Sequence, residues 1–166
     1  RRQGEGGRLE VANLNAPGQV VVAGSSADID WVVANSSDLG VRRAVPLKVG
    51  GAFHSSFMET ASAEVGAVLD SVSISAPGFP VWSNTTARPH EVDGLTATMQ
   101  RQVVSTVRFA ECLADMSTVG IDTFVHVGPG DVTAAMAKRS VEGASVYVVS
   151  SLGDIPGVVA SIVSIG

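Results

Sequence analysis

The sequence predicts an α/β protein in which helices cover a largely parallel sheet, and two observations support this prediction. In residues 48–166, short apolar runs alternate with helical patterns, as they do where helices connect the strands of a parallel sheet. In residues 1–47, two β-rich runs follow one another with no helix between them. We therefore expect residues 1–47 to form a small subdomain and residues 48–166 to form a larger α/β part.

The small subdomain should begin with a β-hairpin. Leu9–Asn13 and Gln19–Ala23 are rich in residues that favour strands. Between them, Asn15-Ala16-Pro17-Gly18 is a strong turn signal, because proline and glycine each preset a backbone conformation that turns require. The two runs are therefore predicted to pair.

A helix is expected next, over Ala27–Leu39, followed by a third strand over Val41–Leu47. Ser25 and Asp28 have the spacing of an amino-terminal cap, and Gly40 is a typical residue at which a helix stops. The apolar residues that we expect this helix to bury are Ile29, Val32 and Val33.

The larger part opens with a glycine-rich loop that carries a histidine. Gly50-Gly51 permits backbone conformations closed to other residues, and His54 stands just before a predicted helix over Phe57–Val72. Ser56 and Glu59 have the spacing of a capping box for that helix. An imidazole at such a position can reach into a cleft while its backbone stays fixed, which is what a general base requires.

The rest of the chain continues the alternation of strands and helices. The polar tract 84–94 is predicted to be a loop, and glycine-containing turns separate the later elements. Further strands are predicted at 81–83, 123–127 and 146–149, and further helices at 95–104, 109–119, 132–141 and 155–165.

Composition excludes several classes of protein. The net charge is −5 and no basic stripe is interleaved with aromatic residues, which argues against a nucleic-acid partner. No apolar run approaches the roughly 20 residues that cross a bilayer, so we expect no membrane association. A single cysteine, Cys112, rules out an intrachain disulfide and favours a reducing compartment. We expect a cytoplasmic protein.

The three histidines differ in their surroundings. His54 has either a structural or a catalytic role, and the residues alone leave both open. His90 lies in a charged loop, where a solvated side chain is expected, and His126 alternates with valines in a predicted strand, where a hydrogen-bonded core histidine is expected. Because no cysteine or paired carboxylate accompanies them, the sequence predicts no metal site.

The segment Gly128-Pro129-Gly130-Asp131 joins a predicted strand to a predicted helix. Such a turn is able to hold a phosphate at the helix amino terminus. It matches neither dinucleotide-binding nor P-loop spacing, and Asp131 would repel an anion, so a tight structural turn is the favoured interpretation.

Four motifs occur together in a family of known proteins. They are Val11-Ala12-Asn13-Leu14-Asn15 with Pro17-Gly18-Gln19-Val20-Val21-Val22-Ala23-Gly24, then Gly51-Ala52-Phe53-His54, then Arg101-Gln102, and finally Val127-Gly128-Pro129-Gly130. In this order and spacing the chain resembles the malonyl-CoA:acyl carrier protein transacylases of fatty-acid synthesis and the related acyltransferase domains of polyketide synthases. The resemblance covers essentially the whole chain but only about half of the family's domain.

The resemblance implies a fold. The implied fold is a partial α/β-hydrolase-like parallel sheet with part of an inserted ferredoxin-like subdomain. Residues 1–47 would be the insert without its opening strand and helix, and residues 48–166 would be the carboxyl-terminal part of the large subdomain. This boundary agrees with the one that the local patterns indicate near Leu47.

The resemblance also implies roles for five residues. His54 matches the catalytic histidine that deprotonates a serine for attack on the malonyl thioester. Gln102 matches the position whose backbone carbonyl fixes the histidine's tautomer, although Ser105-Thr106-Val107 follows it here in place of the family's usual Asn-Pro-Val. Asn13 and Asn15 match residues that line the acyl cleft. Phe53 resembles the bulky residue of malonyl-selective members, so malonyl should be preferred over methylmalonyl.

The implied substrates are malonyl-CoA and an acyl carrier protein, whose own phosphopantetheine carries the accepting thiol, and no bound cofactor is implied. The sequence holds no Gly-x-Ser-x-Gly turn, so the serine would come from a missing amino-terminal half, and the chain alone is expected to be inactive. A different class of function stays open, in which the chain is a non-catalytic module that binds acyl-CoA or a carrier protein. A nucleotide-binding domain that uses the turn at Gly128–Asp131 is a third alternative.

Overall fold

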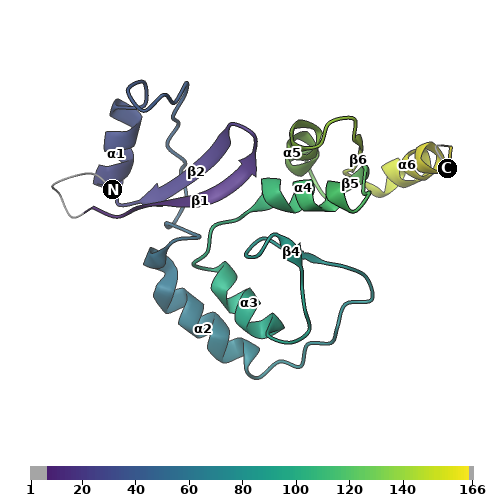
Figure 1. Ribbon diagram of the computed structural model, residues 1–166, viewed down its shortest axis with the longest axis horizontal. Coiled ribbons are helices and arrows are strands. Elements are labelled where there is room, and N and C mark those ends of the chain that lie inside the picture. Colours follow the sequence, from purple (N-terminus) through teal and green to yellow (C-terminus); the bar gives the residue numbers. More distant parts are fainter. Residues whose placement is uncertain (1–6, 165–166) are drawn as a thin grey trace.

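The computed structural model describes residues 7–164, and Figure 1 shows them as three neighbouring groups of elements. A hairpin with one helix lies at the amino end, a pair of helices lies below it, and a group of helices and strands lies beside it. Helices and strands alternate along most of the chain, as an α/β class requires.

The predicted hairpin is present and is longer than expected. Strand β1 spans Leu9–Ala16 and pairs antiparallel with β2, Gln19–Gly24. Gly18 in the turn has a φ of 72°, a left-handed conformation that glycine adopts at little cost.

Helix α1 spans Ser26–Ala34, so it begins about where predicted and ends earlier than Leu39. The Ser25 hydroxyl caps it by accepting from the Asp28 amide. The end lies at Asn35, whose backbone amide and side-chain amide both donate to the Trp31 carbonyl, at 3.0 Å and 2.8 Å. The prediction that this helix buries Ile29, Val32 and Val33 was wrong, because these three side chains are only half-buried.

Asp28 is instead the buried residue of α1. Its carboxylate accepts from the Ser25 hydroxyl at 2.6 Å and from the Arg8 amide at 3.2 Å. These bonds satisfy the carboxylate and tie α1 to the start of β1.

The predicted strand over Val41–Leu47 is wrong. Residues 41–49 form neither strand nor helix, and Val45 and Leu47 are 55 % and 60 % exposed. A β-rich run becomes a strand only where a neighbouring strand pairs with it, and Pro46 lacks the amide that such a ladder needs.

The segment after His54 forms a 3₁₀ turn, Ser56–Met58, that continues into α2, Glu59–Leu69. The expected capping box was wrong, because the Ser56 hydroxyl bonds to Glu10 of β1, and Met58, the residue at the cap position of α2, makes no side-chain capping bond. Helix α2 packs against α3, Leu95–Gln102. The close approach requires Gly66, since a Cβ there would lie 2.6 Å from the Gln100 side chain.

A short antiparallel pair precedes α3. Strand β3, Trp82–Ser83, pairs with β4, Arg88–Pro89. The predicted strand at 81–83 is thus present in part, and the stretch predicted as loop contains β4 as well.

The carboxyl-terminal group holds the parallel pair of strands. Its elements are α4 (Phe109–Thr118), β5 (Thr123–Val127), α5 (Val132–Ser140), β6 (Ser145–Val149) and α6 (Ile155–Val163). Strands β5 and β6 are parallel, with Thr123 opposite Ser145 and Val127 opposite Val149. The last residue of the helix predicted over 155–165 lies outside the described residues.

The core of this group is small. Leu113, Ala137 and Val141 are buried and pack together as one cluster, and they come from α4 and from α5 and its carboxyl-terminal end. The half-buried apolar residues packed around them are Phe109, Met116, Phe124, Ala144 and Val146. Across residues 7–164, no helix is both long and apolar enough to traverse a bilayer.

The hairpin is attached to this group at two places. The Arg139 guanidinium of α5 donates to the Pro17 carbonyl at 2.6 Å and to the Gln19 side chain at 3.1 Å. Farther along β1, the backbone of Ala12 and Leu14 exchanges two 2.8 Å hydrogen bonds with Val107.

Candidate active site

The loop that carries His54 has a strained backbone. His54 has a φ of 60°, in the left-handed region, which costs a residue with a side chain about 1–3 kcal/mol. The next residue, Ser55, is fully buried, and its hydroxyl donates to the Ala52 carbonyl to close the turn. A strained conformation persists only where its surroundings hold it, so the contacts around this loop fix where the imidazole lies.

The His54 ring meets the end of α3. Its Nδ1 lies 2.9 Å from the Gln102 carbonyl oxygen, and its backbone amide donates to the Val103 carbonyl at 3.2 Å. Carbonyls in the last turn of a helix lack an intrahelical partner, which leaves the Gln102 oxygen available. Since a carbonyl oxygen only accepts, Nδ1 carries the proton in neutral His54 and Nε2 keeps the lone pair.

The Gln102 side chain anchors the same point of α3. Its Oε1 accepts from the Thr85 hydroxyl at 2.9 Å, which ties the helix end to the turn between β3 and β4. Within residues 7–164 its Nε2 is buried without a hydrogen-bond partner. Gln102 is therefore held through one end of its amide.

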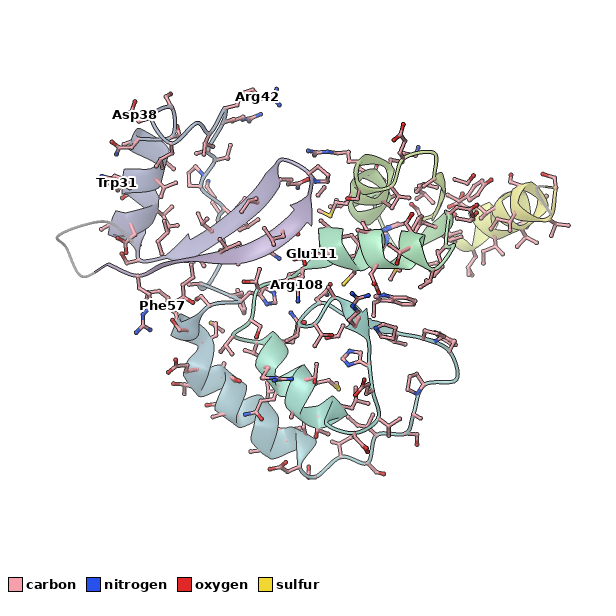
Figure 2. The ribbon with its side chains drawn as sticks, in the orientation of Figure 1. Trp31, Asp38, Arg42, Phe57, Arg108 and Glu111 are labelled. Atoms are coloured by element: carbon pink, nitrogen blue, oxygen red, sulfur yellow. The ribbon has the colours of Figure 1, made fainter. Side chains whose placement is uncertain are left out.

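The link between α3 and α4 is fixed on both sides. The Thr106 hydroxyl donates to the Val11 carbonyl of β1 at 2.7 Å. Figure 2 shows Arg108 and Glu111 together at the start of α4, where the Arg108 Nε donates to the carboxylate at 3.0 Å. Arg108 also donates to the Thr86 carbonyl at 3.1 Å. The hydrogen bond from Arg108 lowers the pKa of the Glu111 carboxyl, which keeps the pair charged at neutral pH.

The remaining predicted site residues lie around this centre. Asn13 and Asn15 are half-buried on β1, and the backbone of Asn13 forms a parallel bridge with Val107 in the link after α3. Phe53 precedes His54 and is 53 % exposed. The structure thus joins His54 to Gln102 by a hydrogen bond and brings β1 alongside the link that follows Gln102.

Sequence reasoning missed Glu10 and the contact that it makes with Ser56 beside the histidine loop. Glu10 of β1 and Ser56 are bonded to each other through the Ser56 amide and hydroxyl. The two are 46 positions apart, so no local spacing relates them. The available signal was a serine at a helix start, where an anion is favoured, and it does not identify which carboxylate binds.

Cys112 and His126 have local roles. Cys112 is buried, its sulfur lies 3.4 Å from the Ser83 carbonyl oxygen, and burial raises the pKa of its thiol, so it is a poor nucleophile. His126 Nδ1 bonds to the Thr133 hydroxyl, so the predicted hydrogen bond is present, but the residue is half-buried and not in a core.

The turn after β5 favours the structural interpretation. Gly128 and Gly130 both have positive φ, of 141° and 84°. The Gly128 amide donates to the Val149 carbonyl at 3.0 Å, which leaves it unavailable to a phosphate. The turn therefore joins a strand to a helix and offers little to an anion.

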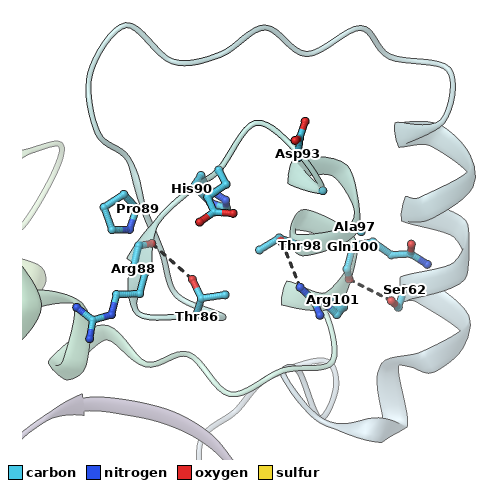
Figure 3. Close-up of a pocket in the computed structure, with 12 residues that line it drawn as sticks. Ser62, Thr86, Arg88, Pro89, His90, Asp93, Ala97, Thr98, Gln100 and Arg101 are labelled. Atoms are coloured by element: carbon cyan, nitrogen blue, oxygen red, sulfur yellow. Dashed lines mark hydrogen bonds between the residues drawn. The ribbon is translucent and has the colours of Figure 1, made fainter.

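A separate pocket of about 610 Å³ lies between α3 and the segment around β4 (Figure 3). His90, Arg88 and Arg101 are among its lining residues, and Arg101 donates to the Thr98 hydroxyl at 3.2 Å. His54 does not line it. Its mixture of acidic and basic side chains shows no preference for one charge.

Comparison with known proteins assigns this arrangement to a family. The model of the acyl transferase domain matches residues 2–157. The chain belongs to the acyl transferase domain family. One curated relative of this acyl transferase chain, the malonyl CoA-acyl carrier protein transacylase of Bacillus subtilis (strain 168), is 35 % identical over 136 residues, which cover 81 % of the chain and 43 % of the relative.

Solved structures agree with this assignment. FabD from Acinetobacter baumannii superposes with a TM-score of 0.90 at 27 % identity, over 97 % of this chain and 51 % of that one. A type II PKS acyl-carrier protein in complex with its malonyl-transacylase gives 0.89 at 26 % identity, over 95 % and 51 %. The expected α/β fold, as part of the larger acyltransferase fold, is confirmed. The chain spans about half the length of the relatives that it matches.

Proposed function

We propose that this chain supplies the base and part of the acyl cleft of a malonyl-CoA:acyl carrier protein transacylase. The observation that carries the proposal is the 2.9 Å contact between His54 Nδ1 and the Gln102 carbonyl, which leaves Nε2 to accept a proton. Membership in the acyl transferase family and the names of the relatives supply the substrates. The serine nucleophile would come from residues outside this chain.

In this mechanism His54 transfers a proton in each half-reaction. Its Nε2 takes the serine hydroxyl proton as the serine oxygen attacks the malonyl thioester carbon. The carbon–sulfur bond then breaks, and the departing CoA thiolate receives that proton. The carrier's phosphopantetheine thiol next gives its proton to Nε2 and attacks the acyl ester, and the serine oxygen regains the proton. The chain binds both malonyl-CoA and the carrier protein as reactants and needs no resident cofactor.

The division of the chain at residue 47 belongs to the same proposal. Residues 1–47 form the partial ferredoxin-like subdomain and residues 48–166 the carboxyl-terminal part of the large one. Support comes from residues 41–49, which form neither helix nor strand. Asn13 and Asn15 line the acyl cleft from the small subdomain, and the enzyme works in the cytoplasm, the reducing compartment that a single unpaired cysteine favours.

The test uses a joined acyltransferase, in which the part of the Bacillus subtilis relative that this chain does not match is fused ahead of residues 1–166. Malonyl transfer from malonyl-CoA to acyl carrier protein is expected from the joined acyltransferase and not from residues 1–166 alone. Turnover by the chain alone, or none by the joined acyltransferase, contradicts the proposal.

Phe53 should restrict the acyl group. Phe53 immediately precedes His54 in the sequence, and by the family resemblance its ring would meet an α-methyl branch of the substrate. One methyl group is worth about 1–3 kcal/mol in an apolar pocket. Phe53→Ala in the joined acyltransferase is therefore expected to raise the methylmalonyl-to-malonyl ratio of kcat/KM about tenfold or more. Phe79→Ala, which removes a ring that is 74 % exposed, is the matched control. An unchanged ratio in Phe53→Ala contradicts this role.

Residues 1–166 alone should associate with themselves. Large apolar side chains are exposed in the carboxyl-terminal group, with Val127 at 76 %, Leu152 at 85 % and Val163 at 73 %. Exposed apolar area of this kind promotes association. Light scattering during size-exclusion chromatography should show oligomers that the joined acyltransferase does not form. A monomer with sharply cooperative unfolding at high concentration would refute this expectation.

A further inference from the structure

Ser56 lies between two charged side chains from the start of β1. Its backbone amide donates to Glu10 Oε2 at 3.0 Å, and its hydroxyl donates to Glu10 Oε1. The Arg8 guanidinium donates to the same hydroxyl at 3.0 Å. Figure 1 shows the amino end of α2 directly below β1, where this cluster forms. One carboxylate thus binds both donors of Ser56.

The next residue of the helix joins the same cluster. The Arg8 guanidinium lies 5.6 Å from the centre of the Phe57 ring, within the range of a cation–π contact. Figure 2 shows Phe57 at the amino end of α2, beneath the start of β1. The beginning of β1 therefore holds two consecutive residues of the helix start.

This bond matters because of where Ser56 stands. It is two residues after His54, and the residue between them, Ser55, is fully buried. The left-handed backbone of His54 is held on one side by the Gln102 and Val103 carbonyls of α3. On the other side, the Glu10–Ser56 bonds hold the chain as it leaves the loop.

The chemistry at this point favours a charged carboxylate. Amides in the first turn of a helix have no intrahelical acceptor, and a negative charge there is stabilised by the helix dipole. The hydrogen bonds from the Ser56 hydroxyl and amide lower the pKa of the Glu10 carboxyl, which keeps it ionised near neutral pH. A charged acceptor makes each of these bonds stronger than a neutral one would.

We propose that Glu10 is a positioning residue for His54. By clamping Ser56 to β1, it keeps the histidine loop and the hairpin in fixed relation, so that Nε2 is held where the serine proton arrives. This inference rests on the proposed function, because it gives Glu10 a role through the His54 base. Glu10 itself contacts neither substrate in this account.

The test compares Glu10→Ala, Glu10→Gln and Ser56→Ala in the joined acyltransferase. Small misplacement of a catalytic group costs up to about 10²-fold in rate, so Glu10→Ala should lower kcat about tenfold or more while KM for malonyl-CoA stays within about twofold. Glu10→Gln keeps one acceptor oxygen and should recover part of kcat. Ser56→Ala keeps the amide bond and should lose less than Glu10→Ala. Glu59→Ala removes an exposed acid from the first turn of the same helix and is the matched control.

A spectroscopic measurement separates positioning from folding. The His54 ring signals, assigned by their loss in His54→Ala, should shift in Glu10→Ala and stay in place in Glu59→Ala. Unchanged ring signals with full kcat in Glu10→Ala overturn the positioning role, even if that variant unfolds at a lower temperature. If His54→Ala retains full activity, the proposed function itself fails. If Glu10→Ala does not fold, the kcat of Ser56→Ala is the test of the positioning role, and an unchanged kcat in that variant overturns the inference.

Discussion

His54→Ala in the joined acyltransferase is expected to lower malonyl transfer by about 10²–10⁴-fold, the usual contribution of a positioned general base. The imidazole is the group whose Nδ1 bonds to the Gln102 carbonyl at 2.9 Å, and alanine leaves nothing to accept the serine proton. The rate of transfer to acyl carrier protein, measured with both substrates saturating, reports this loss. The KM for malonyl-CoA should change little, because the ring acts on the nucleophile.

The other two histidines of the chain provide the controls. His90 lines the separate pocket beside α3, and His126 bonds to Thr133 in the carboxyl-terminal group. Replacing each by alanine should leave transfer within about threefold of the parent rate, since neither meets the candidate site. Full turnover in His54→Ala, or equal losses in all three variants, would falsify the assigned role. Carrier-protein binding without transfer in the unsubstituted joined acyltransferase would favour the non-catalytic module.

Leu113→Ala is expected to lower the free energy of unfolding of the joined acyltransferase by about 2–5 kcal/mol, the range for removing a fully buried leucine side chain. Leu113 is 3 % exposed and lies at the centre of the small core that α4 shares with α5 and its carboxyl-terminal end. The side chains packed around the cluster are only half-buried and have some freedom to close the cavity. The cost should therefore fall in the lower part of the range.

Urea unfolding followed by circular dichroism measures this effect. Leu39→Ala is the control, because that side chain is 50 % exposed in the turns after α1, and its removal should cost about 0.5 kcal/mol or less. Activity at temperatures below the transition should survive in Leu113→Ala, because the residue is remote from His54 in its contacts. Equal destabilisation by the two variants would show that the core is placed wrongly.

Local patterns predicted most elements of this fold. The hairpin followed from its Pro17-Gly18 turn, and strand β5 from an apolar run between glycine turns. The failures have long-range causes. Residues 41–47 have strand composition but no pairing partner among residues 7–164, and the Ser56 hydroxyl binds a carboxylate 46 positions away instead of the nearby helix amides.

The candidate site shows the same limit. His54 stood out because glycines precede it and a helix follows it. The contact with Gln102 spans 48 positions, and only resemblance to a family pointed to it. Glu10 had no signal at all, since a glutamate in a strand facing water looks the same as one that binds a helix end. The roles of Asn13, Asn15 and Phe53 stay predictions for the experiments above.

The attachments of β1 have a consequence for the acyl cleft of the proposed transacylase. The hairpin is bonded near its tip by Arg139, in its middle by Val107 and near its base through Glu10. A hairpin that is bonded at three points along its length cannot move outward without breaking several hydrogen bonds together. Under the proposed function, in which Asn13 and Asn15 of β1 line the acyl cleft, the size of the acyl group is then limited by the side chains that face it. Substituting those side chains, and not loosening the hairpin, would enlarge the substrate range.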